Sequence, residues 1–524
     1  MKTKRLDIFS LHFLWVAAYP VFFLYAWNAG ELPLGALFLP LLVSIGASLF
    51  LYGVFFLVFR NGRRAAMAAS LSLIFFLSYG RIHEGLNVLN EPAIWRHRYL
   101  LPFFGLLFAG IFYLSARMKE SWLTAWTRGL HLFGVFLLFV SLFQTGVAEA
   151  GKAKAPSRAG DFLEEEKSFA GQGPLERPDI YCIILDGYAR ADVLREVYHY
   201  DNAWFIEELR KLGFYVSSES CSNYHTTYFS LASSLNMDYL DGRLKGVPRF
   251  SKNMNVLGEM IAHNRVCRLL RGMGYRYAHL ASGWRVTMDS PLADVRYGDF
   301  TRGNLGFWDR FDDLTILFLQ GTILKPWVNQ QVLWVGHHRV KNNLRGLLRL
   351  AGLQGPKFVF CHLVAPHPPY VIDREGRERE GARMDPGLWE PKEQYVDQLV
   401  FVNREVLRVV KALVRRSKTK PVILIHADHG PAATIRDWDR PSELNLKERM
   451  SIFSAFYLPG SGRELLYDSI SPVNFFRVVF NAYLGGRYEL LPDKAYFGNL
   501  TRPFELHAVT DKVRREKFIH ESRL

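Results

Sequence analysis

The first 147 residues of this 524-residue chain contain five apolar stretches, which constrain its fold more than any other feature. A helix of about 20 apolar residues crosses the roughly 30 Å of hydrocarbon in a bilayer. A signal peptide does not explain the pattern, because four more apolar segments follow the first and no small-residue cleavage site comes after it. The sequence therefore predicts a transmembrane bundle over residues 1–147, with helices at about 9–28, 34–59, 65–82, 99–116 and 129–147.

Basic residues flank these stretches, so the net charge of +15 has a membrane explanation rather than a nucleic-acid one. Short loops rich in Lys and Arg stay on the cytoplasmic side of a membrane. The rule places there the loops that carry Lys2, Lys4, Arg5, Arg60, Arg63, Arg64, Arg117, Lys119 and Arg128. After five crossings the remainder of the chain lies outside the cytoplasm. We expect a bacterial inner-membrane protein with a cytoplasmic N-terminus, a periplasmic or extracellular C-terminal domain and no nucleic-acid partner.

Residues 148–178 are rich in Gly, Ala, Lys and Glu and lack apolar periodicity, which indicates a linker. Beyond it, residues 179–524 alternate helical patterns with apolar, strand-like runs at about 179–185, 275–281, 357–363 and 421–427. This alternation predicts an α/β domain with a mostly parallel sheet and helices on both faces. Active sites of such sheets gather at the carboxyl ends of the strands.

The four cysteines, Cys182, Cys221, Cys267 and Cys361, show no Cys-x-x-Cys spacing. The pattern therefore predicts neither a zinc ribbon nor a thioredoxin-like redox site. Because Cys182 and Cys361 fall within apolar strand-like runs, we expect buried thiols, although a suitable pair could be oxidised outside the cytoplasm.

Two predicted strands end in acidic residues. Asp186 closes the first strand, and Asp428 and His429 follow the run at 421–427. Carboxyl ends of parallel strands share one edge of a sheet, so these acidic and imidazole groups should emerge together. A strand-end aspartate alone is more often a turn or a helix cap. The functional interpretation depends on their joint occurrence.

A polar turn leads into a small-residue helix between Ser222 and Leu235. The turn places a threonine hydroxyl at a helix N-terminus, where free backbone N–H groups and the positive end of the helix dipole favour a phosphate. A metal-bound threonine alkoxide would be a nucleophile there. The structural alternative is an N-cap, the commoner role of a threonine at a helix start.

The strand at 357–363 leads into a proline-rich loop, and the two together carry His362 and His367. An imidazole at this edge could bind a nonbridging phosphate oxygen or assist a leaving oxygen. Packing beneath the loop is the structural alternative. For His362, the packing role and the functional role are about equally favoured. For His367, the functional role is favoured.

These motifs, in this order and behind several membrane spans, resemble the alkaline phosphatase and sulfatase superfamily, especially its membrane-anchored lipoteichoic acid synthases and phosphoethanolamine transferases. The resemblance covers most of residues 178–496. It implies one divalent ion, Mn²⁺ or Zn²⁺, held by an acidic residue, a nucleophilic threonine and an Asp-His pair. The matching residues here are Asp186, Thr227, Asp428 and His429.

The same resemblance implies that His367 contacts the transferred phosphate and takes part in catalysis. His362, Asn223 and Arg190 are the further candidate substrate contacts. Arg190 could guide an anionic head group, with an ordinary ion pair as the alternative.

Asp186 departs from the glutamate usual in the transferases, and its Asp-Gly setting is similar to the superfamily's phosphodiesterases and glycosylphosphatidylinositol-anchor transferases. Thr227 is favoured over Thr226 by its offset from the pairs at 223–224 and 230–231, which is similar to that in sulfatase-like bacterial membrane proteins. The Cys/Ser-x-Pro/Ala-x-Arg context of true sulfatases does not occur near Thr227. No second set of metal ligands is evident, which favours transfer over hydrolysis.

The resemblance thus implies a phosphotransferase that moves a phosphoglycerol or phosphoethanolamine head group from a bilayer phospholipid, through a phosphothreonine, to an envelope glycan or lipid. A phosphodiesterase or sulfatase-type hydrolase is one alternative. The other is a non-catalytic protein on the same fold that senses lipid or lipopolysaccharide. The head group, the acceptor, the metal and the oligomeric state are open at this point.

Overall fold

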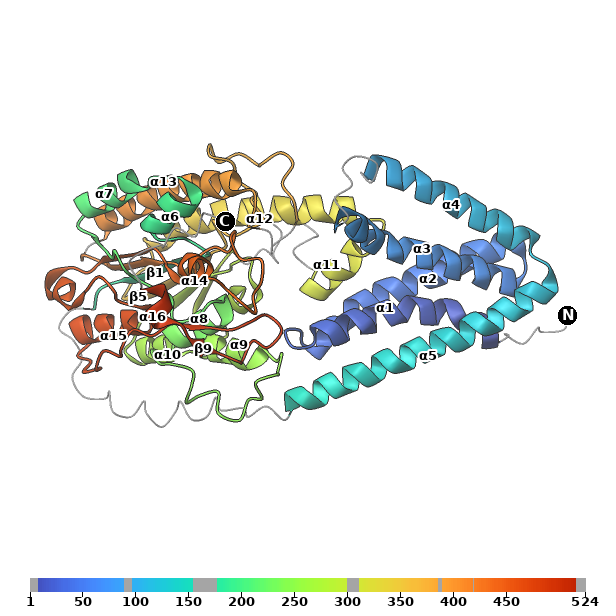
Figure 1. Cartoon of the computed structure of the whole chain (residues 1–524), viewed down its shortest axis with the longest axis horizontal. Coiled ribbons are helices and arrows are strands. Elements are labelled where there is room, and N and C mark those ends of the chain that lie inside the picture. Colours follow the sequence, from blue (N-terminus) through green and yellow to red (C-terminus); the bar gives the residue numbers. More distant parts are fainter. Residues whose placement is uncertain are drawn as a thin grey trace, which may run out of the picture. The chain divides into compact units, whose positions relative to one another are not determined.

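The computed structural model describes residues 8–88, 97–153, 177–298, 311–384, 389–417 and 419–514. The chain forms two compact units (Figure 1). The first contains the N-terminal helices and a later segment that ends at Val332. The second contains the α/β domain.

Five helices of the first unit are long and apolar enough to cross a membrane. Each of the five predicted spans lies within one of them, which confirms a bundle of five apolar helices. With the two 3-10 helices that precede α1 and α2, they are η1 (Ile8–Leu11), α1 (His12–Asn28), η2 (Leu34–Leu37), α2 (Phe38–Phe59), α3 (Gly62–Val88), α4 (His97–Arg117) and α5 (Glu120–Ala153).

α5 is longer than predicted and runs through 148–153, the first residues of the predicted linker. These residues include Ala148, Glu149 and Lys152, which are good helix formers and extend the helix beyond its apolar part. Residues 154–176 of the predicted linker lie outside the described residues.

The surface of the bundle is apolar. Large side chains such as Phe50 (69% exposed) and Leu106 (74% exposed) point away from the protein. A surface that faced water would not expose so many of them, so these faces suit lipid. Within the bundle, small residues such as Ala65 and Ala69 are fully buried and let neighbouring helices approach closely.

A short helix from the middle of the chain also packs in the first unit. α11 (Asp313–Gln320) buries Leu314 and Phe318 in one core with Val21 and Tyr25 of α1. The sequence placed this segment with the C-terminal domain, because a helix this short is not recognisable as part of a membrane bundle.

The turn after α11 is hydrogen-bonded to α3. The Gly80 N–H donates to the Gly321 carbonyl at 2.9 Å, and the Ile323 N–H donates to the Phe76 carbonyl at 3.0 Å. A Cβ at position 80 would lie 2.1 Å from the carbonyl oxygen of Gln320, so this approach requires glycine. α12 (Lys325–Leu350) follows and belongs to the second unit from Leu333 onward.

The second unit contains a seven-stranded sheet in the order β2-β7-β6-β1-β5-β3-β4. The five neighbouring strands β6, β1, β5, β3 and β4 run parallel to one another. β7 is antiparallel to both of its neighbours, β6 and β2. This confirms the predicted α/β domain with a mostly parallel sheet. The strands are β1 (Ile180–Leu185), β2 (Tyr215–Val216), β3 (Arg276–Leu280), β4 (Val295–Tyr297), β5 (Lys357–Leu363), β6 (Val422–His426) and β7 (Ser454–Tyr457).

Helices cover both faces of the sheet (Figure 1). Successive residues of β1 alternate between two cores, with Tyr181 and Ile183 in one and Cys182 and Ile184 in the other. The first core includes α6 (Ala191–Tyr198), α7 (Ala203–Lys211), the later part of α12, α13 (Lys392–Arg416), α14 (Glu443–Met450) and α16 (Thr510–Val513). The second includes α8 (Thr227–Ser234), α9 (Asn255–Ala262), α10 (Arg265–Gly272) and α15 (Pro472–Tyr483).

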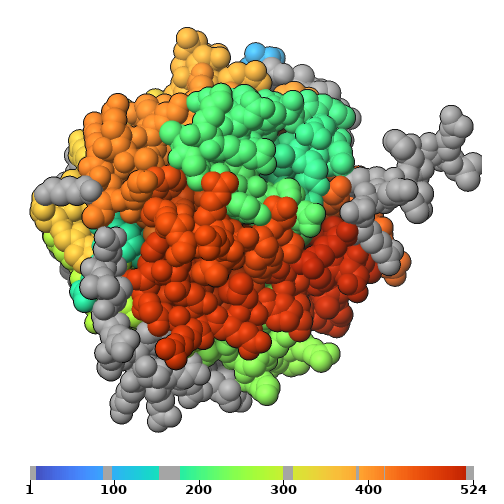
Figure 2. All heavy atoms as spheres, turned by 90° about the vertical axis from the view of Figure 1, so that its left-hand side faces the viewer, coloured from blue at the N-terminus to red at the C-terminus, as the bar shows by residue number. Residues whose placement is uncertain are grey.

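The remaining short elements are η5 (Arg285–Thr287), η8 (Gly460–Leu465) and the pair β8 (Tyr496–Phe497) and β9 (His507–Ala508). On the face of the second unit seen in Figure 2, C-terminal residues in orange to red cover the centre, and the green segment that contains α6 and α7 flanks them. All four cysteines are free and buried.

Candidate active site

The central strands β1, β5 and β6 deliver three candidate ligands to one edge of the sheet. β1 lies between the other two and pairs with both in parallel. Asp186 follows β1, His362 is near the end of β5, and Asp428 follows β6 after one residue. All three are buried, and one ligand atom from each lies within 4.8 Å of the others.

His429 presents one ring nitrogen to both aspartates. Its Nδ1 is 2.9 Å from the Gly430 carbonyl, which assigns the proton to Nδ1 and leaves a lone pair on Nε2. Nε2 lies 3.6 Å from Asp186 Oδ1 and 3.4 Å from Asp428 Oδ2. Burial and the nearby Arg449 guanidinium lower the pKa of His429 well below its usual value. The ring is therefore neutral, the form that binds metals.

The hydroxyl of Thr227 faces the same nitrogen. Thr227 is the first residue of α8, and its Oγ1 lies 3.2 Å from His429 Nε2. Thr226 is the N-cap, but its side chain accepts no cap hydrogen bond, and its Oγ1 is buried without a partner in the described part of the chain. The fold thus brings the hydroxyl of Thr227 into contact with His429.

The aspartate oxygens fit a divalent cation. Both Oδ atoms of Asp186 and Oδ2 of Asp428 are buried and have no hydrogen-bond partner among the described residues. Burial and the charge of Asp186 raise the pKa of Asp428, as expected for two carboxylates that share a site. Burying two such carboxylates side by side costs folding free energy unless a cation binds between them.

The separations between the ligand atoms also suit a cation. Ligands that bind tetrahedral zinc at about 2.1 Å are about 3.4 Å apart. The three separations from His429 Nε2, to Thr227 Oγ1, Asp428 Oδ2 and Asp186 Oδ1, are 3.2, 3.4 and 3.6 Å. We conclude that the donor set fits a divalent metal ion with oxygen and nitrogen ligands, such as Zn²⁺ or Mn²⁺.

His362 contacts a carboxylate. Its Nε2 lies 3.3 Å from Asp186 Oδ2, and its Nδ1 lies 2.7 Å from Thr287 Oγ1. Burial opposes the charged ring, but the attraction of the nearby Asp186 carboxylate outweighs it and raises the pKa of His362. The structure therefore places His362, a candidate substrate contact, beside Asp186 and among the candidate metal-ligand atoms.

His367 lies beside these candidate ligands and is 7% exposed. Its backbone N–H donates to the Asp186 carbonyl at 3.1 Å, and its Nδ1 is 2.6 Å from the Pro368 carbonyl, which leaves Nε2 available. The ring lies beside those of Trp284 and Trp389, with centroid distances of 5.5 and 4.7 Å, and 6.2 Å from the ring of His429. This position suits contact with a group bound beside His429.

Two predicted substrate contacts are engaged within the protein itself. The Asn223 amide donates to Ser471 Oγ at 3.0 Å, and its oxygen accepts from the Val473 N–H at 2.8 Å, which fixes the start of α15. The Arg190 guanidinium donates twice to the Asp192 carboxylate, at 2.7 and 2.8 Å. Both residues therefore have structural partners, and the ion-pair alternative describes Arg190.

Sequence reasoning missed Trp389, whose ring packs against the turn at Gly187, directly after Asp186. Gly187 has φ of +72°, and a Cβ there would lie 2.4 Å from Cη2 of Trp389. The indole ring also lies 4.7 Å from the ring of His367. The glycine after Asp186 was the only signal of this close approach, and it does not identify the residue on the other side.

Arg449 was also missed. Its Nε donates to the His225 carbonyl at 2.7 Å and its Nη1 to the Gly430 carbonyl at 2.8 Å. Arg449 thereby joins the segment that precedes Thr227 to the one that follows His429. It lies at the end of α14, where no strand-end or loop motif distinguishes it from an ordinary charged helix residue.

No protein-family model matches the chain, and no curated protein matches it. Solved structures do. The zinc complex of the C-terminal periplasmic domain of EcEptC from Escherichia coli matches at 13% identity and a TM-score of 0.40, over 64% of this chain and 93% of that one. The integral membrane lipooligosaccharide phosphoethanolamine transferase A (EptA) from Neisseria meningitidis matches at 12% identity and 0.36, over 91% and 95%.

The C-terminal periplasmic domain of phosphoethanolamine transferase EptC from Campylobacter jejuni matches at 13% identity and a TM-score of 0.31, over 58% of this chain and 89% of that one. At such identities and scores, the roles of the site residues depend on the geometry of this chain.

Proposed function

We propose that this chain is a membrane-anchored, metal-dependent transferase of the alkaline phosphatase and sulfatase superfamily. It moves a phosphoglycerol or phosphoethanolamine head group from a phospholipid to an envelope glycan or lipid. One observation carries the proposal: Thr227 Oγ1, His429 Nε2, Asp186 Oδ1 and Asp428 Oδ2 converge at the start of α8, and the two carboxylate oxygens have no hydrogen-bond partner among the described residues. A hydroxyl nucleophile beside a cation site, at a helix N-terminus, is suited to phosphoryl transfer.

Asp186, Asp428, His429 and Thr227 would hold one Zn²⁺ or Mn²⁺, which when bound lowers the pKa of the threonine hydroxyl and neutralises phosphate charge. Thr227 Oγ1 forms the bond to phosphorus and releases its proton to water. The bond between phosphorus and the diacylglycerol oxygen breaks, and a phosphothreonine results. The free N–H groups at the start of α8 bind the phosphate oxygens.

His367 moves the second proton. Because its Nδ1 bonds to the Pro368 carbonyl, its Nε2 is the nitrogen that exchanges a proton with a bound group. In the first half-reaction it protonates the departing diacylglycerol oxygen. In the second it takes the proton of the acceptor hydroxyl as that oxygen attacks the phosphothreonine.

The membrane helices explain the choice of donor. By the positive-inside rule, the basic residues between the five apolar helices favour a cytoplasmic N-terminus, and the second unit would then lie in the periplasm or outside the cell. A domain tethered to the bilayer meets phospholipid at a high effective concentration. A soluble phosphatase would need no such anchor.

Intact-mass analysis tests the proposal. The full-length protein is incubated with Zn²⁺ or Mn²⁺ and vesicles of phosphatidylethanolamine or phosphatidylglycerol. We expect an added mass that identifies the head group, mapped to Thr227, and no such adduct in Thr227→Ala. Absence of the adduct with every donor, or an unchanged adduct in Thr227→Ala, overturns the assignment.

The same incubation, repeated with an envelope lipid and glycan extract as the acceptor, separates the alternatives. Release of free head-group phosphate without transfer to an acceptor indicates a hydrolase. Metal binding and lipid binding with neither release nor adduct indicate a sensor.

A further inference from the structure

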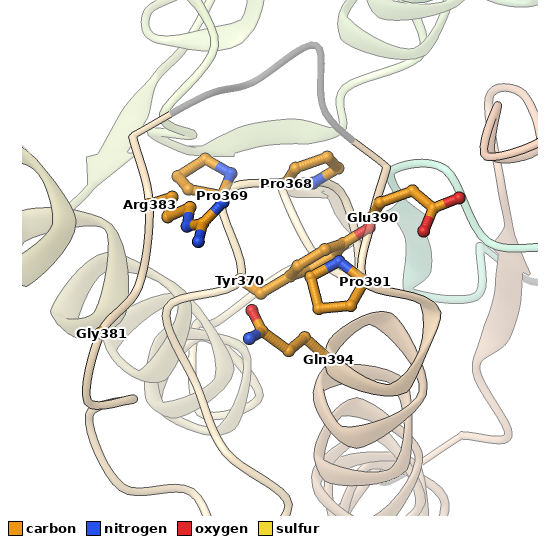
Figure 3. Close-up of a pocket in the computed structure, with 8 residues that line it drawn as sticks. All are labelled: Pro368, Pro369, Tyr370, Gly381, Arg383, Glu390, Pro391 and Gln394. Atoms are coloured by element: carbon orange, nitrogen blue, oxygen red, sulfur yellow. The ribbon is translucent and has the colours of Figure 1, made fainter. Parts of the chain in front are cut away.

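The turn at residues 186–189 is held by Tyr395 of α13, a residue that none of the proposed steps uses. The start of α13 borders a pocket of about 420 Å³, whose lining includes Arg383 and Glu390 (Figure 3). Gln394 also lines this pocket, whereas Tyr395, the next residue, is fully buried. Tyr395 therefore contacts no ligand, and any role in the site acts through the protein groups that it touches.

The Tyr395 hydroxyl is bonded to the backbone of this turn at two positions. It donates to the Gly187 carbonyl at 3.0 Å and accepts from the Ala189 N–H at 3.1 Å. Burial raises the pKa of Tyr395 well above its usual value, so the hydroxyl keeps the proton that it donates. One side chain thus fixes the peptide groups on both sides of residue 188.

The same turn orients one of the candidate metal ligands. The Gly187 N–H donates to Asp428 Oδ1 at 3.2 Å, whereas Asp428 Oδ2 has no hydrogen-bond partner among the described residues. The bond fixes the rotation of the carboxylate, with Oδ2 turned toward His429 Nε2 at 3.4 Å. Outer hydrogen bonds that orient a metal ligand commonly change the metal affinity by about 10- to 100-fold when they are lost.

Loss of the Tyr395 hydroxyl would leave two buried backbone groups without a partner. Gly187 and Ala189 are both buried, so water does not replace the hydroxyl at the Gly187 carbonyl or at the Ala189 N–H. Such unpaired groups are costly inside a protein. The turn would therefore shift to find other partners, and the Asp428 carboxylate would lose its fixed rotation.

We propose that Tyr395 is a positioning residue that sets the metal affinity of the site. Its hydroxyl fixes the turn, the Gly187 N–H of that turn fixes the Asp428 carboxylate, and Oδ2 is thereby held toward the cation. This inference rests on the proposed function for the metal ion. It adds a residue on α13, outside the set of ligands, on which the binding of that ion depends.

Zinc titrations of the full-length protein in detergent test this role with two matched variants. Tyr395→Phe removes the hydroxyl that holds the turn. Tyr188→Phe removes an equally buried hydroxyl, which bonds to the side chains of Asn202 and Asn403 instead. We expect the Zn²⁺ affinity to fall tenfold or more in Tyr395→Phe and to stay within twofold of wild type in Tyr188→Phe.

Melting temperatures in chelator show that the two variants are matched. Each removes a buried hydroxyl with two hydrogen-bond partners, so both should lower the melting temperature of the metal-free protein by a similar amount. A general loss of stability then predicts the same loss of affinity in both. Equal affinities in wild type and Tyr395→Phe, or equal losses in the two variants, overturn the proposal.

Bound Co²⁺ reports the arrangement of the ligands directly. The visible absorption of Co²⁺ depends on the number and geometry of its ligands, and a merely structural role does not alter it. We expect a changed spectrum in Tyr395→Phe, where the Asp428 carboxylate is free to rotate, and a wild-type spectrum in Tyr188→Phe. A wild-type spectrum in Tyr395→Phe contradicts the proposal.

Hydrogen exchange of the wild-type protein needs no variant, so it decides the matter even where Tyr395→Phe does not fold. Zn²⁺ should slow exchange of the Gly187 and Ala189 amides at least tenfold more than that of the Ser217 amide. Ser217 donates to the Ser454 carbonyl, outside the site. Equal slowing of all three amides overturns the coupling between the turn and the metal.

The positioning role and the proposed function fail in different ways. If wild type binds Zn²⁺ and Tyr395→Phe binds it equally well, only the positioning role is overturned. If the expected difference in affinity is found but no phosphothreonine forms with any phospholipid, only the transferase is overturned. A wild-type protein that binds no Zn²⁺ overturns both.

Discussion

The hydroxyl oxygen of Thr227 lies 3.2 Å from Nε2 of His429, across a sequence separation of 202 residues. That nitrogen is the one that the Gly430 carbonyl leaves without a proton. The contact therefore joins the proposed nucleophile to a nitrogen whose lone pair can bind a metal ion, and it distinguishes Thr227 from its neighbour Thr226.

Replacing each threonine in turn should have opposite results. Thr227→Ala removes the proposed nucleophile, so transfer activity and the phosphothreonine adduct should be lost. Thr226→Ala removes a buried hydroxyl without a described partner, so activity should stay within a few-fold of wild type and stability should not fall. A head-group transfer assay with mass mapping measures both, and loss of activity only in Thr226→Ala would reverse the assignment.

Asp428→Asn should abolish metal binding without weakening the metal-free protein. The variant removes the repulsion between the carboxylates of Asp428 and Asp186 that accompanies the raised pKa of Asp428. In chelator its melting temperature should equal or exceed that of wild type. Zn²⁺ at 100 times its dissociation constant should stabilise only wild type, by about 2.7 kcal/mol. Equal metal content in the two proteins, measured by elemental analysis, would move the site elsewhere.

Gly187→Ala should destabilise the second unit and disturb the site. An alanine at φ of +72° costs about 1–2 kcal/mol, and its Cβ would also lie 2.4 Å from the Trp389 ring. Gly355→Ala is the matched control, since φ there is +80° but no atom lies within 4 Å of the added Cβ. Thermal unfolding should show the larger loss for Gly187→Ala, and equal losses would mean that the ring contact is unimportant.

Gly80→Ala should detach the turn after α11 from α3. The added methyl group would lie 2.1 Å from the Gln320 carbonyl oxygen, in a position where the Gly80 N–H bonds to Gly321. Gly85→Ala, in the same helix with nothing within 4 Å, is the control. We expect faster proteolysis near residue 321 and a lower melting temperature in detergent for Gly80→Ala alone. Similar behaviour of the two variants would contradict the contact.

The stability of the second unit should fall in mild acid through His279. Burial lowers its folded-state pKa to about 4 from 6.5. The unfolded chain therefore takes up a proton near pH 6.5 and the folded chain only near pH 4, so stability is lost as the pH drops between these values. The full effect is about 3 kcal/mol at 1.36 kcal/mol per pKa unit. In chelator, His279→Gln should show a smaller loss of stability between pH 6.5 and 4.5 than wild type, and identical losses would exclude His279 as the source.

The candidate ligands at the strand ends were predictable because each directly follows an apolar run that is visible in the sequence. An apolar run that ends in Asp186, and another that ends before Asp428 and His429, indicate a carboxyl edge from sequence alone. Arg449 and Trp389 were not predictable, because their roles depend on which distant segments they contact. The same reason explains Asn223 and Arg190, whose polar groups are used by α15 and by Asp192.

Local patterns also determined the five membrane helices and the four main strands, since the length of an apolar run is enough to recognise each. Only the tertiary structure decided that α11 packs among the N-terminal helices, that Thr227 rather than Thr226 faces His429, and that Arg383 and Glu390 share a pocket. Each of these depends on contacts between segments far apart in the chain, and burial at such contacts leaves no periodic trace in the sequence.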